Sequence, residues 1–297
     1  MLSKTNITKY SIVSIVLTAG VFFTLSGHAP TKATKKSNST NIVSAPVKAP
    51  VSEATKTDNS TDTASAPVNT VVSKVDVQAI AKKSELNNYV LKVIPSYDGD
   101  KYPYLLNNDY DHYNGVTENI IYKGSLIAKA NPDRSKSSHC VGLTYEVFFK
   151  AMKERNKEAG LAPDNFNNMT INNMRDFMLT WYDAEGTPKS KGDQLAGAIV
   201  KYGLGNQITR LEDAKAGDFI DFSRTKSGHT AVFINWLRDD KSNIVGFKFW
   251  STQKSTNGIA YKEEYFSDNP QEAFKGTVNR NQLYIGRVGS IANYKSF

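Results

Sequence analysis

Residues 217–236 read GDFIDFSRTKSGHTAVFINW and hold two apolar stretches separated by a polar segment. Asp218–Phe222 alternates polar and apolar residues, whereas His229–Trp236 is almost continuously apolar. Both patterns are typical of β-strands. Two further apolar runs of strand length follow them, Val245–Ser251 and Leu283–Val288. The segment Arg238–Asn243 has the chemistry of a turn, which predicts a hairpin between the second and third strands.

Helical patterns precede these strands. Apolar residues recur at spacings of three and four over Cys140–Glu158, which predicts a helix. Thr170 is a suitable N-cap for a second helix that runs to Trp181. We expect a third helix over Asp193–Tyr202 and an additional one within residues 74–95. Helices followed by antiparallel strands indicate an α+β domain.

The first 30 residues have the organisation of an export signal. Lys4 and Lys9 precede an apolar stretch from Ser11 to Leu25, which is slightly short for a membrane-spanning helix. Small residues follow, and Pro30 stands just after the expected cleavage point. We therefore predict a signal peptide or an uncleaved anchor, and an extracytoplasmic location for the rest of the chain.

Residues 31–73 are rich in Ser, Thr, Ala and Pro and contain no aromatic residue. Such a segment buries too little apolar surface to offset its ordering entropy, so we predict a disordered linker. Aromatic residues are dense after it, which predicts a single domain over residues 74–297.

The composition excludes several classes of function. The chain carries 37 Lys and Arg residues against 29 Asp and Glu residues, a net charge of +8. The excess is spread without a dense basic run, so we expect no nucleic-acid partner. Cys140 is the single cysteine, which excludes an internal disulfide and a multi-cysteine zinc site. We predict neither a metal nor a cofactor.

Cys140 stands at the start of a predicted amphipathic helix, where unpaired backbone N–H groups and the helix dipole favour a thiolate. A buried structural cysteine is the alternative interpretation. A catalytic thiol needs a base, and the chain has four histidines. His28 lies in the signal segment, His112 in a Tyr- and Asp-rich loop, and His139 is adjacent to the cysteine. His229 opens a rigid apolar strand and is the predicted base.

The segment AKAGDFIDFSRTKSGHTAVFINW, residues 214–236, resembles the second half of the catalytic core of NlpC/P60 and CHAP cysteine peptidases. The nucleophile motif of these families is similar to Cys140–Leu143, CVGL, and the order of the motifs matches. The separation of 89 residues from Cys140 to His229 leaves room for extra helices. The resemblance implies a papain-like domain in which the cysteine helix packs on an antiparallel sheet.

The family's third catalytic residue lies on the strand after the histidine strand and is a His, Asn, Gln or acid. Here that strand and its end read GFKFWSTQKSTNG, residues 246–258. Gln253 is the first candidate to orient His229, because its amide oxygen can accept from the imidazole N–H. Ser251 is the alternative and Asn257 the third candidate.

The resemblance also implies an oxyanion site and a substrate surface. The backbone N–H of Cys140 is the natural oxyanion donor. A tyrosine upstream of the cysteine would assist it, and Tyr122 and Tyr113 are the candidates. We name Tyr122 and Trp250 as candidate substrate-binding residues.

Together these features predict a secreted, cell-wall-associated cysteine hydrolase that cleaves amide bonds in peptidoglycan through a Cys140–His229 acyl-enzyme mechanism. Stem-peptide endopeptidase and amidase activity both remain open. One alternative is a papain-like hydrolase or transferase that acts on non-wall substrates. The other is a secreted wall-binding or adhesion module with a degenerate pocket. We expect a monomer with no membrane contact beyond the N-terminal signal.

Overall fold

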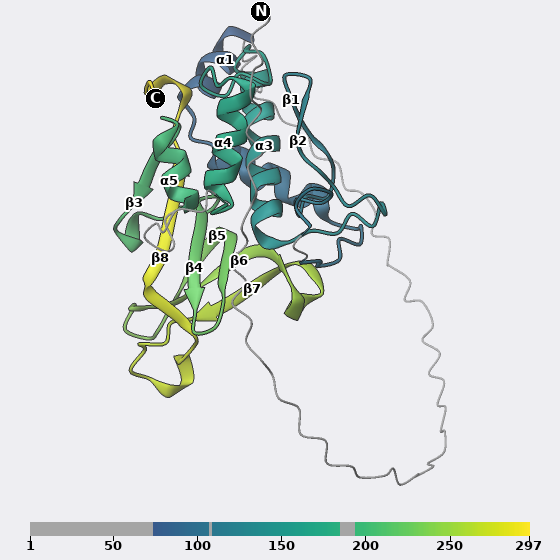
Figure 1. Cartoon of the computed structure of the whole chain (residues 1–297). Coiled ribbons are helices and arrows are strands. Elements are labelled where there is room, and N and C mark those ends of the chain that lie inside the picture. Colours follow the sequence, from purple (N-terminus) through teal and green to yellow (C-terminus); the bar gives the residue numbers. More distant parts are fainter. Residues whose placement is uncertain (1–73, 107–108, 185–193) are drawn as a thin grey trace, which may run out of the picture. The chain divides into compact units, whose positions relative to one another are not determined.

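Six strands form one antiparallel sheet in the computed structural model of the chain, which describes residues 74–106, 109–184 and 194–297 (Figure 1). Their order across the sheet is β3-β8-β4-β5-β6-β7. The strands are β3 (Gly205–Ile208), β4 (Phe219–Arg224), β5 (Gly228–Arg238), β6 (Ile244–Gln253), β7 (Gly258–Tyr265) and β8 (Val278–Val288). A separate small hairpin pairs β1 (Ile120–Tyr122) with β2 (Ser125–Ala128). The predicted signal segment and linker lie outside the described residues.

Five α-helices accompany the sheet in the described part of the chain. They are α1 (Lys74–Lys83), α2 (Asn87–Val93), α3 (Cys140–Glu158), α4 (Ile171–Trp181) and α5 (Gln194–Lys201). The predicted boundaries of α3 are confirmed, and so is the cap of α4, where Thr170 and Asn173 form a capping box. The helix expected within residues 74–95 is instead two helices separated by a break. The mixed α+β class with an antiparallel sheet is confirmed.

The main hydrophobic core lies between the helices and one face of the sheet. In Figure 1, α3 and α4 stand on the same side of the strands. The three central strands contribute Phe219 of β4, Val232 of β5 and Trp250 of β6 to this core. They pack with Phe148 of α3 and Leu195 of α5 among others. Helix α3 is therefore supported on β5 and β6, with its first turn over the start of β5.

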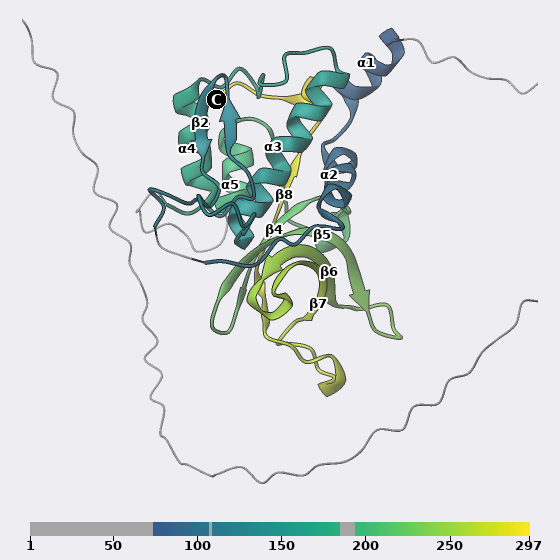
Figure 2. The same cartoon turned by 90° about the vertical axis from the view of Figure 1, so that its right-hand side faces the viewer.

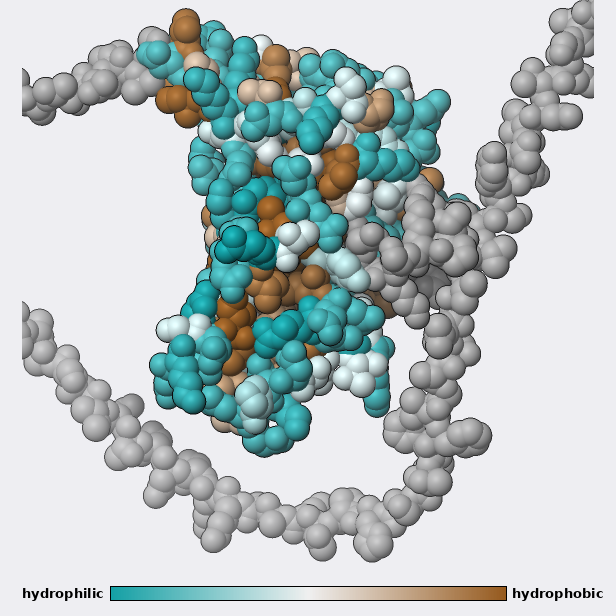
Figure 3. Space-filling view, turned by 90° about the vertical axis from the view of Figure 1, so that its left-hand side faces the viewer, coloured by the Kyte–Doolittle hydropathy of each residue, from teal (hydrophilic) through white to brown (hydrophobic). Residues whose placement is uncertain are grey.

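The opposite face of the sheet has its own apolar cluster. β6 and β7 curve strongly, as Figure 2 shows, and this cluster consists mainly of side chains of the sheet itself. Its aromatic members are Phe222, Phe233, Phe247, Phe249 and Phe266. On the molecular face in Figure 3, hydrophobic atoms gather in the lower half, bordered by hydrophilic ones. Both faces of β5 are thus covered by apolar side chains, which explains its continuous apolar sequence.

A buried carboxylate ties α3 to the loop before β1. Glu146 is 1% exposed and accepts hydrogen bonds from the Thr117 N–H, the Thr117 hydroxyl and the Tyr97 hydroxyl. Lys150, one turn further along α3, pairs with the same carboxylate at 2.8 Å. This network holds the helix that carries Cys140. None of the helices in the described ranges is long and apolar enough to cross a membrane.

Candidate functional site

The start of α3 is fixed by close backbone packing. His139 is the N-cap, and its Nδ1 accepts a hydrogen bond from the Gly142 N–H at 3.3 Å. The His139 N–H donates to the Gly115 carbonyl at 3.1 Å. A Cβ at Gly142 would lie 2.2 Å from the Gly115 oxygen, and a Cβ at Gly115 would lie 2.0 Å from the His139 ring. Both glycines are therefore required for Cys140 to occupy the first helical position.

The Cys140 sulfur lies near Thr230, the third residue of β5. Both the backbone N–H and the hydroxyl of Thr230 favour the thiolate form of Cys140 and so lower its pKa. The Thr230 hydroxyl also lies 3.3 Å from the Thr144 hydroxyl, which in turn accepts from the Trp181 indole N–H at 3.3 Å. A chain of polar groups thus runs from the core of the helical layer to the sulfur.

The sheet frees the Thr230 backbone for this contact. The register of β5 with β6 runs from Val232 opposite Trp250 to Arg238 opposite Ile244. The Thr230 carbonyl accepts from the Ser251 hydroxyl at 2.8 Å instead of from a backbone N–H of β6. The two strands thus separate at the level of Cys140. On that side the backbone groups of Thr230 face side chains, such as that of Ser251.

Burial raises the pKa of the Cys140 thiol, and the carboxylate of Asp221 raises it further. The hydrogen bonds from Thr230 and from the Val141 N–H favour the thiolate but are outweighed. The sequence predicted that the helix start would lower this pKa. That prediction is wrong because the thiol is desolvated between α3 and β5. The free protein therefore holds Cys140 mainly as a thiol at neutral pH.

His229 does not meet Cys140, which overturns the predicted nucleophile–base contact. Its ring packs edge-on against Phe222 and Phe249, with distances between ring centroids of 5.4 and 5.6 Å. Both phenylalanines belong to the apolar cluster on the face of the sheet opposite the helices. Thr230, the next residue, faces the helices. Successive side chains of a strand point to opposite faces, so the sheet separates His229 from Cys140.

The environment of His229 is that of a buried neutral imidazole. Its Nε2 has no hydrogen-bond partner among the described residues. Burial lowers the pKa of His229 well below its usual value, and the charges of Arg224 and Lys262 lower it further. The imidazole is accordingly held uncharged.

The predicted third residues are also occupied elsewhere. Gln253 accepts from Arg224 at 3.0 Å and donates to the Ser255 hydroxyl at 2.6 Å. Arg224 forms two further hydrogen bonds to the Glu264 carboxylate, at 2.6 and 2.7 Å. Gln253 is thus part of an ion-pair cluster on β4, β6 and β7. Ser251 lies nearer the site, because its hydroxyl bonds to the Thr230 carbonyl.

The candidate substrate-binding residues lie in the core. Tyr122 is fully buried against Phe149 and Phe166, and its hydroxyl donates to the Met169 carbonyl. Trp250 is 1% exposed. These two predictions are wrong because both side chains are enclosed in the main hydrophobic core and cannot meet a substrate. Tyr113, the other oxyanion candidate, is also buried and donates to the Leu105 carbonyl.

Four residues around the thiol were missed by the sequence analysis. Thr230 and Asp221 come from the sheet, and Tyr104 and Tyr110 from the loop before β1. Burial and then the charge of the Cys140 thiolate raise the pKa of both tyrosines, so both lie within electrostatic range of the sulfur. Asp221 had a signal, because it is the one charged residue between Phe219 and Phe222 in a buried strand.

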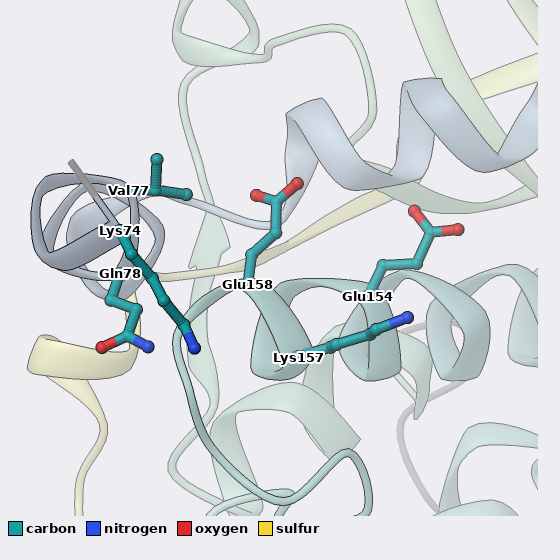
Figure 4. Close-up of a pocket in the computed structure, with 6 residues that line it drawn as sticks. All are labelled: Lys74, Val77, Gln78, Glu154, Lys157 and Glu158. Atoms are coloured by element: carbon teal, nitrogen blue, oxygen red, sulfur yellow. The ribbon is translucent and has the colours of Figure 1, made fainter. Parts of the chain in front are cut away.

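Two cavities in the described part of the chain lie away from Cys140. The larger, about 510 Å³, is lined by α1 and the last turns of α3, and Figure 4 shows two glutamates and two lysines around it. Glu154 is 14 residues beyond Cys140 on the same helix, which corresponds to about 21 Å. A second cavity of about 310 Å³ adjoins Arg224 and Lys262. Neither holds the thiol.

The site therefore consists of one thiol, the polar groups of Thr230, a carboxylate and two phenols. In the described part of the chain, no group of three or more His, Cys, Asp or Glu residues is arranged to hold a metal ion. Comparison with protein-family models, with curated proteins and with solved structures gave no match to this chain.

Proposed function

We propose that this chain is an exported cysteine hydrolase with a papain-like core of the NlpC/P60 type, and that Cys140 attacks amide bonds of cell-wall peptidoglycan. The observation that carries the proposal is the position of the sulfur. It lies at the first residue of a helix that packs on an antiparallel sheet, and the first turn of this helix contacts Thr230 at the start of β5 through Thr144. The order along the chain supports it: the cysteine helix α3 comes first, then β4 directly after Gly217 and Asp218, then β5, which begins with Gly228 and His229.

The reaction would be acyl transfer. The Cys140 sulfur attacks the amide carbonyl, the amine leaves, and water hydrolyses the thioester. The Cys140 backbone N–H, at the N-terminus of the 19-residue helix α3, is the natural donor to the developing oxyanion. The partly exposed rings of Tyr104 and Tyr110 would line the approach to the sulfur.

The substrate class rests on sequence features and the family resemblance. An apolar N-terminal segment with preceding lysines favours export, and a Ser- and Thr-rich linker gives reach through a wall. The net charge of +8 suits a wall rich in anionic polymers. Peptidoglycan stem peptides and cross-bridges are then the amides within reach.

A wall-binding module without catalysis is the second candidate. One observation favours it: His229 lies on the far face of the sheet from Cys140, so the family's catalytic pair is not assembled. The raised pKa of the Cys140 thiol is in keeping with this candidate. The two functions differ in whether Cys140 is needed for a chemical product.

Mass spectrometry of muropeptides separates them. The full chain and its Cys140→Ser variant are incubated with insoluble peptidoglycan, and the soluble and bound fractions are analysed. Hydrolysis predicts new end groups with the wild type only: a cut stem peptide for an endopeptidase, or a stem peptide released from the sugar for an amidase. Identical muropeptides, with both proteins retained on the wall, would support the binding module instead.

A further inference from the structure

Asp221 and Thr230 form a cross-strand pair beneath the start of α3. They are opposite each other in the antiparallel ladder of β4 and β5. The Thr230 carbonyl turns toward β6, where it accepts from Ser251. The Asp221–Thr230 pair is therefore a non-hydrogen-bonded pair of the β4–β5 ladder, in which side chains are closest, with Cβ atoms about 4.5–5.5 Å apart.

The parity of β4 places Asp221 on the helical face. Phe219, two residues before Asp221, belongs to the core beneath the helices. Phe222, the residue after Asp221, belongs to the apolar cluster on the opposite face of the sheet. Thr230 on this same face as Asp221 meets the first turn of α3, where its hydroxyl lies 3.3 Å from that of Thr144, one turn after Cys140, and it favours the Cys140 thiolate. The Asp221 carboxylate is thus a charged acceptor next to the residue that contacts the thiol, and it is partly exposed.

The other groups near the sulfur are less suited to accept its proton. His139 is the adjacent residue, but its Nδ1 accepts from Gly142 and its ring is buried against Tyr110, Tyr113 and Tyr182. His229 faces the other way. Tyr104 and Tyr110 are phenols whose protons are held more tightly than usual.

We propose that Asp221 is the general base of the Cys140 reaction and that Thr230 positions the sulfur for it. This inference rests on the proposed function. As the C–S bond forms, the thiol proton passes to the Asp221 carboxylate. The resulting carboxylic acid protonates the leaving amine as the C–N bond breaks. In the second step Asp221 takes a proton from water, the hydroxyl attacks the thioester, and the proton returns to the departing sulfur.

This arrangement differs from a preformed thiolate–imidazolium pair. The negative charge of Asp221 disfavours the thiolate in the free protein, so the proton must leave during the attack. Ionisation of the thiol and turnover should therefore respond in opposite directions when Asp221 is neutralised. A residue that only supports the fold would change both in the same direction or neither.

The test compares wild type with Asp221→Asn, Asp221→Glu and His229→Asn in the full chain. Three rates are measured: muropeptide hydrolysis, acylation of Cys140 by p-nitrophenyl acetate, and alkylation by iodoacetamide at pH 7.5. For Asp221→Asn we expect hydrolysis and acylation to fall about a hundredfold or more, with alkylation at least as fast as in wild type. Asp221→Glu should regain part of the lost rate. His229→Asn should keep hydrolysis and acylation within about threefold of wild type.

The outcomes separate the two proposals. Muropeptide hydrolysis that persists in Asp221→Asn, or is lost in His229→Asn when its melting temperature is retained, overturns the assignment of the base. No hydrolysis of muropeptides together with Asp221-dependent acylation of Cys140 overturns the wall substrate but supports the base. Absence of both hydrolysis and acylation in the wild type overturns both. Parallel loss of acylation and alkylation in Asp221→Asn means a structural role, which also overturns the assignment.

Discussion

Glu146 and Thr117 are joined by two short hydrogen bonds, from the Thr117 N–H at 2.6 Å and from its hydroxyl at 2.7 Å. The carboxylate lies fewer than two turns after Cys140 in α3, so this contact anchors the helix start to the loop that carries Tyr104 and Tyr110. Its partners include Lys150 and the Tyr97 hydroxyl. The support of the candidate site is therefore polar as well as apolar.

Removing this carboxylate should destabilise the fold. Glu146→Ala leaves Lys150 and the Thr117 N–H without their shared acceptor, and we expect the free energy of unfolding to fall by about 3–5 kcal/mol. Urea denaturation followed by circular dichroism measures the change. Glu118, which pairs with the same lysine at 3.0 Å but is exposed, is the matched control. Glu118→Ala should cost less than about 1 kcal/mol, and equal losses in the two variants would contradict the anchoring role.

His139 should make stability depend on pH. Burial lowers the pKa of His139 from 6.5 to about 4, so the unfolded chain binds the proton first as the pH falls. Its contribution is complete above pH 6.5 and is lost between pH 6.5 and 4. A shift of this size corresponds to about 3 kcal/mol. His229 acts in the same direction, so the contribution of His139 is isolated by comparing variants.

The measurement is the free energy of unfolding at pH 4.5 and 7.5. His139→Asn keeps an N-cap but removes the titration, so its stability should fall less than that of the wild type over this interval. His112→Asn serves as the control, because His112 is exposed and pairs with Asp109 outside the core. A pH dependence unchanged by His139→Asn would show that the imidazole is already charged or solvated.

The thiol should react slowly near neutral pH. Because burial and Asp221 raise the pKa of Cys140, its alkylation by iodoacetamide should be slower at pH 7 than in the denatured chain and should increase at alkaline pH. Thr230→Val removes a hydroxyl that favours the thiolate, so its alkylation should be slower still at a given pH. Intact-mass spectrometry gives the rates. Rapid labelling of the native wild type at pH 7 would contradict the raised pKa.

Replacing His229 should leave the thiol undisturbed. His229→Phe fills a space between Phe222 and Phe249 with a ring of similar size and no unpaired nitrogen. We expect alkylation of Cys140 within about twofold of wild type and an equal or higher melting temperature, because a buried unsatisfied polar group is removed. A large change in the alkylation rate would place the imidazole next to the sulfur after all.

The sequence predicted the helices that have clear ends. Cys140–Glu158 and the Thr170 cap are defined by local side-chain chemistry, and both are confirmed. The hairpin across Arg238–Asn243 is confirmed for the same reason. β7 was missed because GIAYKEEY is an edge strand with charged residues, which weakens the strand pattern.

The face of β5 could not be predicted in the same way. His229 and Thr230 are followed by apolar residues that are buried on both faces, so there is no alternation from which to assign a side. Which of the two meets Cys140 depends on the pairing with β4, a property of the folded sheet. The candidate cysteine was therefore identified from the sequence, whereas its neighbours Thr230 and Asp221 required the structure.

The short turn between Arg224 and Gly228 sets the register of β5 against β4. A change in its length that shifted the pairing of β5 with β4 by one residue would turn every side chain of the strand to the other face. The hydroxyl beside Cys140 would then be exchanged for the imidazole of His229, without any substitution in the strand. The register that this turn sets therefore decides which of two neighbouring side chains, a hydroxyl or an imidazole, lies beside Cys140.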